Sequence, residues 1–178
     1  MQTTIATKRL LLELLSPNDN SFILELVNSE GWLKYIGNRK IHSLEEAAVY
    51  IQKINSNPHI TYWVAKLKEN AIPIGIITLI KRDYLEHHDI GFAFLPAFTN
   101  YGYAFEATKE VLSHISQNAE HAHILATTLP GNKNSIRLLE KFGLQLSKEI
   151  EVGDEKLHVY GMAINKLAIS KNESTGIS

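Results

Sequence analysis

The stretch that decides the fold is Asp89–Ile115, with the sequence D-I-G-F-A-F-L-P-A-F-T-N-Y-G-Y-A-F-E-A-T-K-E-V-L-S-H-I. Its first third predicts a strand, its middle a short irregular turn, and its last third a helix. The turn contains Thr99, Asn100 and Gly102, and the glycine lets the backbone approach a ligand closely. A helix that begins there offers unsatisfied N–H groups and the positive end of its dipole, which suit an anion. The stretch therefore predicts a phosphate-binding turn between a strand and a helix.

The strand predicted over residues 88–95 has two different faces, because successive side chains of a strand alternate. The large apolar face consists of Ile90, Phe92 and Phe94, and the small face of Asp89, Gly91 and Ala93. Glycine and alanine are poor strand residues, and a strand glycine often marks close approach by a ligand or another backbone. Two interpretations follow. Either a helix packs tightly on the small face, or a ligand lies along it with Asp89 beside the reactive end of the ligand.

Length and composition indicate one globular domain of 178 residues, 44% of them apolar and 21% charged. The formal net charge of −1 gives no electrostatic support for nucleic-acid binding. The chain has no cysteine, which excludes disulfides and a cysteine nucleophile. We find no signal pattern and no apolar run of membrane-spanning length, so we expect a cytoplasmic protein with no membrane partner. The clusters His87-His88 and His121-Ala122-His123 lack the spacing of a zinc site, and we predict no metal.

The rest of the chain predicts strands and helices on either side of this stretch. Ser43-Leu44-Glu45-Glu46 matches a capping box, and Gly143 stands where a C-cap glycine belongs. The predicted strands cover residues 8–15, 61–67, 73–81, 88–95, 122–129, 144–152 and 156–164. The predicted helices begin near Ser16, Ser43, Tyr101 and Asn132, and residues 31–42 are expected to be irregular.

The predicted order is β-α-α-β-β-β-α-β-α-β-β, an α/β fold with a mixed sheet and helices on both faces. Strands joined by tight turns are expected to pair antiparallel, whereas the helix between the 88–95 and 122–129 strands implies a parallel crossover. We expect one domain over residues 8–165, followed by a polar C-terminal tail over residues 166–178.

The turn resembles the acyl-CoA pyrophosphate loop of the GNAT acetyltransferase superfamily, whose pattern is Gln or Arg, two residues, Gly, one residue, then Gly or Ala. Gly102 and Ala104 fit this pattern. Thr99 stands where Gln or Arg is usual, and Asn100 stands where close relatives often have Gly. The neighbouring residues are similar to those of the ribosomal-protein N-terminal acetyltransferase branch. These residues are Ile90-Gly91-Phe92, Pro96 and Glu106-Ala107.

A second block, residues 132–144, is similar to the family's other signature of Asn, two residues, Ser or Ala, and a helix that ends with a glycine and Phe. Leu144 replaces that Phe. Leu139 stands where many members carry a Tyr that protonates the CoA thiolate, so the resemblance implies Ser135 as the partner of the thiol. The residues alone also allow a structural interpretation, in which Asn132 caps the helix and Ser135 bonds its own backbone.

The resemblance implies the GNAT acyl-CoA N-acyltransferase fold, acetyl-CoA as acyl donor, and direct transfer to an amine in a ternary complex. It places Asp89 as the general base, because an amine of pKa ~8–10 must lose a proton during transfer. A water relay is expected, since Asp is shorter than the usual Glu. The alternative is a strand-end Asp that accepts hydrogen bonds from backbone or Arg, and Asp83, Glu86 and His88 are further acid–base candidates. The implied acetyl-CoA contacts are Phe92, Ala93, Phe94, Leu95, Thr99, Asn100, Tyr101, Gly102, Tyr103, Ala104, Asn132 and Ser135.

The predicted acceptor contacts are Trp32, Tyr35, Trp63 and Arg82. The segment W-L-K-Y-I-G that begins at Trp32 is similar to a loop of this branch that lies over the acceptor end of the cleft. Structural packing of Trp32 is the alternative. The predicted acceptor is a primary amine such as a protein N-terminus. A small-molecule amine (polyamine, amino acid or aminoglycoside) is one alternative, and a CoA-binding sensor domain without catalysis is another. Monomer and homodimer both remain open.

Overall fold

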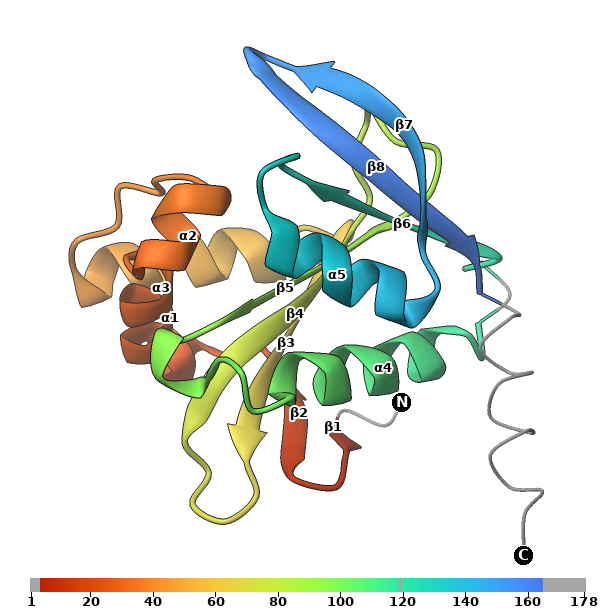
Figure 1. Cartoon of the computed structure of the whole chain (residues 1–178). Coiled ribbons are helices and arrows are strands. Elements are labelled where there is room, and N and C mark those ends of the chain that lie inside the picture. The colour runs from red at the N-terminus through yellow and green to blue at the C-terminus, as the bar shows by residue number, and fades with distance from the viewer. Residues whose placement is uncertain (1–3, 119, 165–178) are drawn as a thin grey trace, which may run out of the picture.

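A computed structural model describes residues 4–118 and 120–164 of the chain (Figure 1). Its centre is an eight-stranded mixed sheet with the strand order β1-β2-β3-β4-β5-β6-β8-β7. The strands are β1 (Thr4–Ala6), β2 (Leu10–Leu14), β3 (Ile60–Leu67), β4 (Pro73–Ile80), β5 (Asp89–Phe94), β6 (His123–Thr128), β7 (Gln145–Val152) and β8 (Glu155–Ala163). The helices are η1 (Pro17–Asp19), α1 (Asn20–Val27), α2 (Glu30–Tyr35), α3 (Leu44–Asn55), η2 (Pro96–Phe98), α4 (Tyr103–Ile115) and α5 (Lys133–Phe142). The predicted α/β class with a mixed sheet is confirmed. The predicted tail over residues 166–178 lies outside the described residues.

The sequence prediction misses two short elements. The edge strand β1 pairs with β2 over three residues, which is too short for an alternating pattern to show. Residues 31–42 are not wholly irregular, because α2 forms a short helix that begins after Ser29 and buries Trp32. The expected strand over residues 8–15 is correspondingly shorter, Leu10–Leu14.

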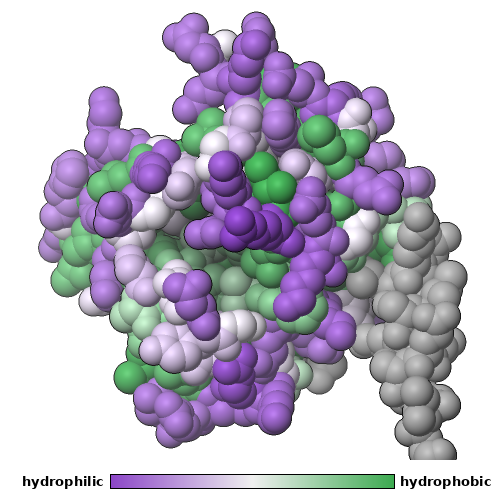
Figure 2. Space-filling view, viewed as in Figure 1, coloured by the Kyte–Doolittle hydropathy of each residue, from purple (hydrophilic) through white to green (hydrophobic). Residues whose placement is uncertain are grey.

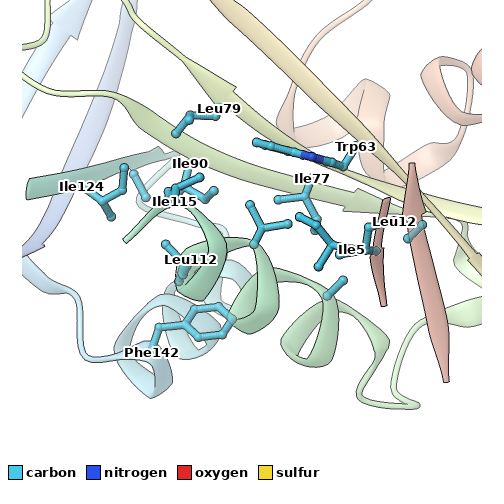
Figure 3. Packing of buried hydrophobic residues seen from close by; sticks show 14 of the residues in the cluster. Ile5, Leu12, Trp63, Ile77, Leu79, Ile90, Leu112, Ile115, Ile124 and Phe142 are labelled. Carbon is cyan, nitrogen blue, oxygen red and sulfur yellow. The ribbon is translucent and has the colours of Figure 1, made fainter. Parts of the chain in front are cut away.

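Helices cover both faces of the sheet, as expected. Helices α4 and α5 bury residues such as Leu112 and Phe142 against Ile77, Ile90 and Trp63 of the sheet (Figure 3). Helices α1, α2 and α3 bury a second set of apolar residues on the opposite face, including Phe22, Ile23, Leu26, Trp32, Ala47, Ile51 and Ile54. Each fully buried large apolar side chain stabilises the fold by about 1.5–3 kcal/mol relative to exposure. The sheet is therefore packed between two layers of helices.

The two faces of β5 are confirmed. Ile90 belongs to the core under α4, with Phe92 and Phe94 packed against the same core. Ala93 packs on the opposite side, against the core formed with α1, α2 and α3. At Gly91 a Cβ would lie 2.7 Å from Oγ1 of Thr78 on the neighbouring strand β4. The side chain of Thr78 therefore requires a glycine at position 91. This reason differs from both sequence interpretations, which invoked a packed helix or a ligand.

Candidate active site

The site is built around the place where β5 and β6 separate. Strands β4 and β5 pair over six residue pairs, from Gly75 with Phe94 to Ile80 with Asp89. In contrast, the parallel register between β5 and β6 contains a single pair within the described residues, Asp89 with Leu125. Figure 1 shows the two strands diverging beyond that point. In Figure 2 a recessed strip of apolar and weakly polar surface lies between α5 and the segment that follows β5.

The backbone N–H and C=O groups of every second residue of β5 point toward this opening. The N–H of Leu125 donates to the carbonyl of His88, so the carbonyl of His88 points toward β6. Because backbone groups alternate sides along a strand, the N–H and C=O groups of Phe92 and Phe94 also point toward the opening. The N–H of Leu95 instead donates to Ile74 of β4, and Ala93 pairs with β4 in the same way. Of the four β5 contacts expected from the sequence, only two therefore offer free backbone groups.

The predicted phosphate-binding turn lies at the end of this opening and has an unusual backbone. Asn100 has φ +68°, a left-handed value that Asn tolerates better than most residues. Gly102 is the N-cap of α4 with φ +80°, and no side chain caps this helix. The first helical hydrogen bond joins the N–H of Glu106 to the carbonyl of Gly102, which leaves the N–H groups of residues 103–105 unused by the helix. The predicted turn therefore has the donors that an anion needs.

Arg9, which lies between β1 and β2, contacts this turn, and the sequence prediction misses it. Its Nη1 donates to the carbonyl of Tyr101 at 2.9 Å, and its guanidinium carbon lies 4.3 Å from the ring centroid of Tyr103. Its backbone N–H and its Nε each donate to Glu106 at 2.7 Å, on different carboxylate oxygens. Burial favours the neutral form of Glu106, but hydrogen bonds from Thr7 and Arg9 outweigh burial and hold its pKa below the ordinary value. No local pattern could reveal this contact, because Arg9 and Glu106 lie 97 residues apart.

Asp89 lies at the closed end of the opening and is only 4% exposed. Oδ2 accepts hydrogen bonds from Nε of Arg82 at 2.5 Å and from Oγ1 of Thr127 at 3.0 Å. Oδ1 accepts one from the N–H of Thr127 at 3.0 Å. Burial raises the pKa of Asp89 above its ordinary value, although Arg82 and Thr127 act in the opposite direction. Asp89 thus accepts hydrogen bonds from an Arg and from the backbone, as a strand-end Asp without a catalytic role would. Its carboxylate also binds a proton more readily than that of an exposed Asp.

The predicted acceptor residues are not brought together as a group. Arg82 reaches Asp89, as expected for that end of the site. Trp63 is corrected to a core residue: it is 6% exposed and belongs to the core under α4, on the sheet face opposite to Ala93. Trp32 is 4% exposed within the α1–α3 core, so packing accounts for it, and Tyr35 is half-buried on α2.

Tyr62 and Tyr50, which the sequence prediction does not name, lie on the same sheet face as Gly91 and Ala93. Tyr62 is paired in register with Thr78, which is paired with Gly91 of β5. Its hydroxyl lies 3.5 Å from the hydroxyl of Tyr50 on α3. Burial raises the pKa of Tyr62, while the charges of Arg39 and Arg82 act in the opposite direction. A cavity of about 360 Å³ beside α3 is lined by Arg39, Lys40, Ile41, Glu45, Glu46, Val49, Tyr50 and Lys53.

Helix α5 follows β6 and carries the second predicted block. Oδ1 of Asn132 accepts a hydrogen bond from the N–H of Ser135 at 3.3 Å, which is the N-cap of the structural interpretation. Leu139 is buried, and Gly143 ends the helix with φ +97°. Ser135 is half-buried.

Histidines gather at the closed end of the β5–β6 pair. The rings of His87 and His123 stack with centroids 5.0 Å apart, and those of His88 and His121 meet edge to face at 4.7 Å. Among the described residues, no three or more His, Cys, Asp or Glu side chains are grouped so as to hold a metal ion. Within residues 4–118 and 120–164, no helix combines the length and apolarity needed to cross a membrane.

This cluster predicts a loss of stability at mildly acidic pH. Burial, His121 and Lys81 all lower the pKa of His88 below 6.5. The unfolded chain therefore binds a proton at this position before the folded chain does, so the free energy of unfolding falls as pH drops below 6.5. Urea unfolding of the wild type and of His88→Gln at pH 7.5 and ~5.5 measures this. The variant is expected to lose less stability than the wild type over this range, and equal losses would contradict the assignment.

Comparison with known proteins identifies the family of the chain. Residues 9–145 match the family described as the acetyltransferase (GNAT) domain. An uncharacterized N-acetyltransferase of Bacillus subtilis, YnaD, is 29% identical over 90% of this chain and 95% of its own length. The crystal structure of a GNAT-family acetyltransferase from Bacillus anthracis has a TM-score of 0.76 at 25% identity, covering 91% of this chain and 99% of that one.

Two further structures share the fold at lower identity and contain CoA. The ribosomal-protein α-N-acetyltransferase RimL in complex with coenzyme A has a TM-score of 0.78 at 12% identity, covering 91% of this chain and 98% of that one. Spermidine N-acetyltransferase from Vibrio cholerae in complex with CoA and spermine has a TM-score of 0.76 at 17% identity, covering 90% and 98%. These likenesses concern the fold.

Proposed function

The chain belongs to the acetyltransferase (GNAT) family, and on that premise we propose that it transfers the acetyl group of acetyl-CoA directly to a primary amine at the β5–β6 opening. The observation that carries the proposal is that β5 and β6 share a single residue pair in the part of the chain that the structure describes. Beyond it, the backbone of β5 leads as a free edge to the uncapped start of α4. An extended acyl-pantetheine arm can pair with such an edge as an added strand would, with its pyrophosphate on the N–H groups of the turn.

The backbone of β5 also supplies the polarising group for the transfer. A developing negative charge on the thioester oxygen is stabilised by an N–H fixed in a dry site. Phe92 and Phe94 direct N–H groups into the opening, and both rings pack against the core. In this proposal one of these N–H groups holds the oxyanion, while Ala93 and Leu95 hold β5 to β4.

Asp89 is proposed as the group that removes the proton from the amine, through a water molecule. Its raised pKa makes it a better base than an exposed Asp. Oδ1 accepts one hydrogen bond, so the atom retains a lone pair for a water molecule. Arg82 and Thr127 fix the carboxylate in place. Ser135 and Asn132 on α5 are proposed to contact the CoA thiol side, with no obligatory acid role for Ser135.

For the acceptor we propose a protein or peptide N-terminus rather than a polyamine. The cavity beside α3 is lined by three positive side chains (Arg39, Lys40, Lys53) against two negative ones (Glu45, Glu46), and the negative charge of Asp89 is already paired with Arg82. A polyamine with several positive charges meets like charge at such a site, whereas an α-amine has a lower pKa and is more often neutral. The RimL and spermidine enzymes have different acceptors but share this fold, so the fold does not favour either acceptor. The charges around the site support a protein or peptide N-terminus.

Thiol release from acetyl-CoA with a panel of amines tests the proposed function. A peptide with a free N-terminus is expected to give a kcat/KM at least about tenfold above that of spermidine or an aminoglycoside, which corresponds to ~1.4 kcal/mol. The same peptide with a blocked N-terminus is the matched control and is expected to give no release above hydrolysis. Faster turnover of spermidine would identify a small-molecule enzyme. Acetyl-CoA binding without release for any amine would identify a sensor domain.

A further inference from the structure

The proposed phosphate-binding turn lacks a positive side chain of its own. Residues 99–104 are T-N-Y-G-Y-A, and the first turn of α4 adds the carboxylate of Glu106. A phosphate at this helix start would share the first turn of α4 with that negative charge, and repulsion between them opposes what the helix dipole contributes. The turn can therefore bind a strongly anionic ligand only if Glu106 is neutralised.

Arg9 provides the neutralisation from another part of the sheet. Its backbone is fixed on both sides, because its N–H donates to Glu106 and its carbonyl accepts from the N–H of Lys68 at 2.9 Å. Its side chain pairs with Oε2 of Glu106 through Nε and holds the carbonyl of Tyr101 through Nη1. The remaining nitrogen, Nη2, lies 3.4 Å from the position that a Cβ on Gly102 would occupy. The guanidinium side chain is 40% exposed, so this end of Arg9 reaches solvent beside the turn.

We propose that Arg9 is a positioning residue for the phosphate groups of acetyl-CoA. It cancels the charge of Glu106, fixes the carbonyl of Tyr101, and adds positive charge beside Gly102. Its effect acts on the phosphates and not on the acetyl end, since its contacts lie on the turn and α4 rather than on Asp89. This inference rests on the proposed use of acetyl-CoA by the same turn.

Comparing acetyl-CoA with acetyl-pantetheine, which lacks the phosphates, separates this role from a purely structural one. Arg9→Gln is expected to raise the KM for acetyl-CoA about tenfold or more with little change in kcat, because the lost hydrogen bonds and charge act on the phosphates. The kcat/KM for acetyl-pantetheine is expected to stay unchanged. Arg9→Lys restores the charge without the planar fork and is expected to recover part of the affinity. Lys8→Gln, an exposed neighbour with the same charge change, is the matched control and is expected to leave the KM unchanged.

Glu106→Gln gives a second, independent test, in which CoA affinity is expected not to fall. Removing this carboxylate leaves the charge of Arg9 free for phosphate, so CoA affinity measured by calorimetry is expected to stay equal or to increase. A structural clamp would instead weaken binding, because Gln keeps only one acceptor oxygen and cannot accept the hydrogen bonds of both the Arg9 N–H and its Nε on separate oxygens. The inference is overturned if Arg9→Gln binds acetyl-CoA as the wild type does, if acetyl-pantetheine turnover falls in proportion, or if Glu106→Gln weakens CoA binding. If the wild type binds no CoA at all, the proposed function itself fails.

Discussion

Replacing Gly102 by Val is expected to lower the affinity for acetyl-CoA by about 100-fold or more, which is ~2.7 kcal/mol. Gly102 has φ +80°, where an L-residue costs about 1–2 kcal/mol and a β-branched one is still less tolerated. The new side chain would also approach Nη2 of Arg9. The turn can relieve both only by rotating its backbone, which moves the N–H groups of residues 103–105 away from the phosphate position.

Gly153 offers a matched control for backbone strain. It has φ +61° in the β7–β8 turn, and nothing lies within 4 Å of the position of an added Cβ. Gly153→Val therefore introduces a comparable strain far from the opening. Calorimetric titration of acetyl-CoA into both variants and the wild type is the measurement, with circular dichroism to verify folding. The expected result is loss of binding in Gly102→Val alone. Near-normal affinity in that variant would show that the turn does not hold the cofactor.

Asp89→Asn is expected to lower kcat by about 100-fold, which is within the range for removal of a general base. The neutral amide cannot accept the proton of the amine, although it keeps the size of the carboxylate. In the wild type the rate is expected to fall as pH drops through the raised pKa of Asp89, because only the carboxylate form acts. This acidic limb of the pH–rate profile is expected to disappear in the variant.

The stability of Asp89→Asn must be measured together with its activity. The substitution leaves the partly buried Arg82 without its charge partner, and breaking a buried pair is costly. Acetyl-CoA affinity and circular dichroism report whether the site remains folded. Asp83→Asn, an exposed neighbour, is the matched control and is expected to retain activity. Full turnover in Asp89→Asn with an unchanged pH profile would show that Asp89 only holds Arg82 and Thr127.

Rules that act within a few residues predicted much of the fold. Ser43 caps α3 by accepting the N–H of Glu46, as the capping-box pattern predicts. Gly143 ends α5 in the left-handed conformation that a C-cap glycine adopts. The alternation of Phe92 with Ala93 correctly assigned the two faces of β5.

Features that depend on distant contacts could not be predicted in this way. Alternation shows that Tyr62 and Trp63 face opposite sides of β3, but it does not say which side faces Asp89. The structure puts Trp63 in the core under α4 and Tyr62 in the core formed with α1, α2 and α3. The contact between Arg9 and Glu106 depends on how the ends of the sheet and α4 meet, which no local pattern contains.

The central claim is that the free edge of β5 and the start of α4 bind acetyl-CoA, and backbone amide NMR during a CoA titration tests it most directly. The expected result is that the largest changes occur at Phe92, Phe94 and residues 103–105. The amide of Leu95, which is bonded to β4, is expected to change less. If the largest changes fall instead on the cavity beside α3 that includes Tyr50 and Lys53, with β5 and the turn unaffected, the account of this site is contradicted.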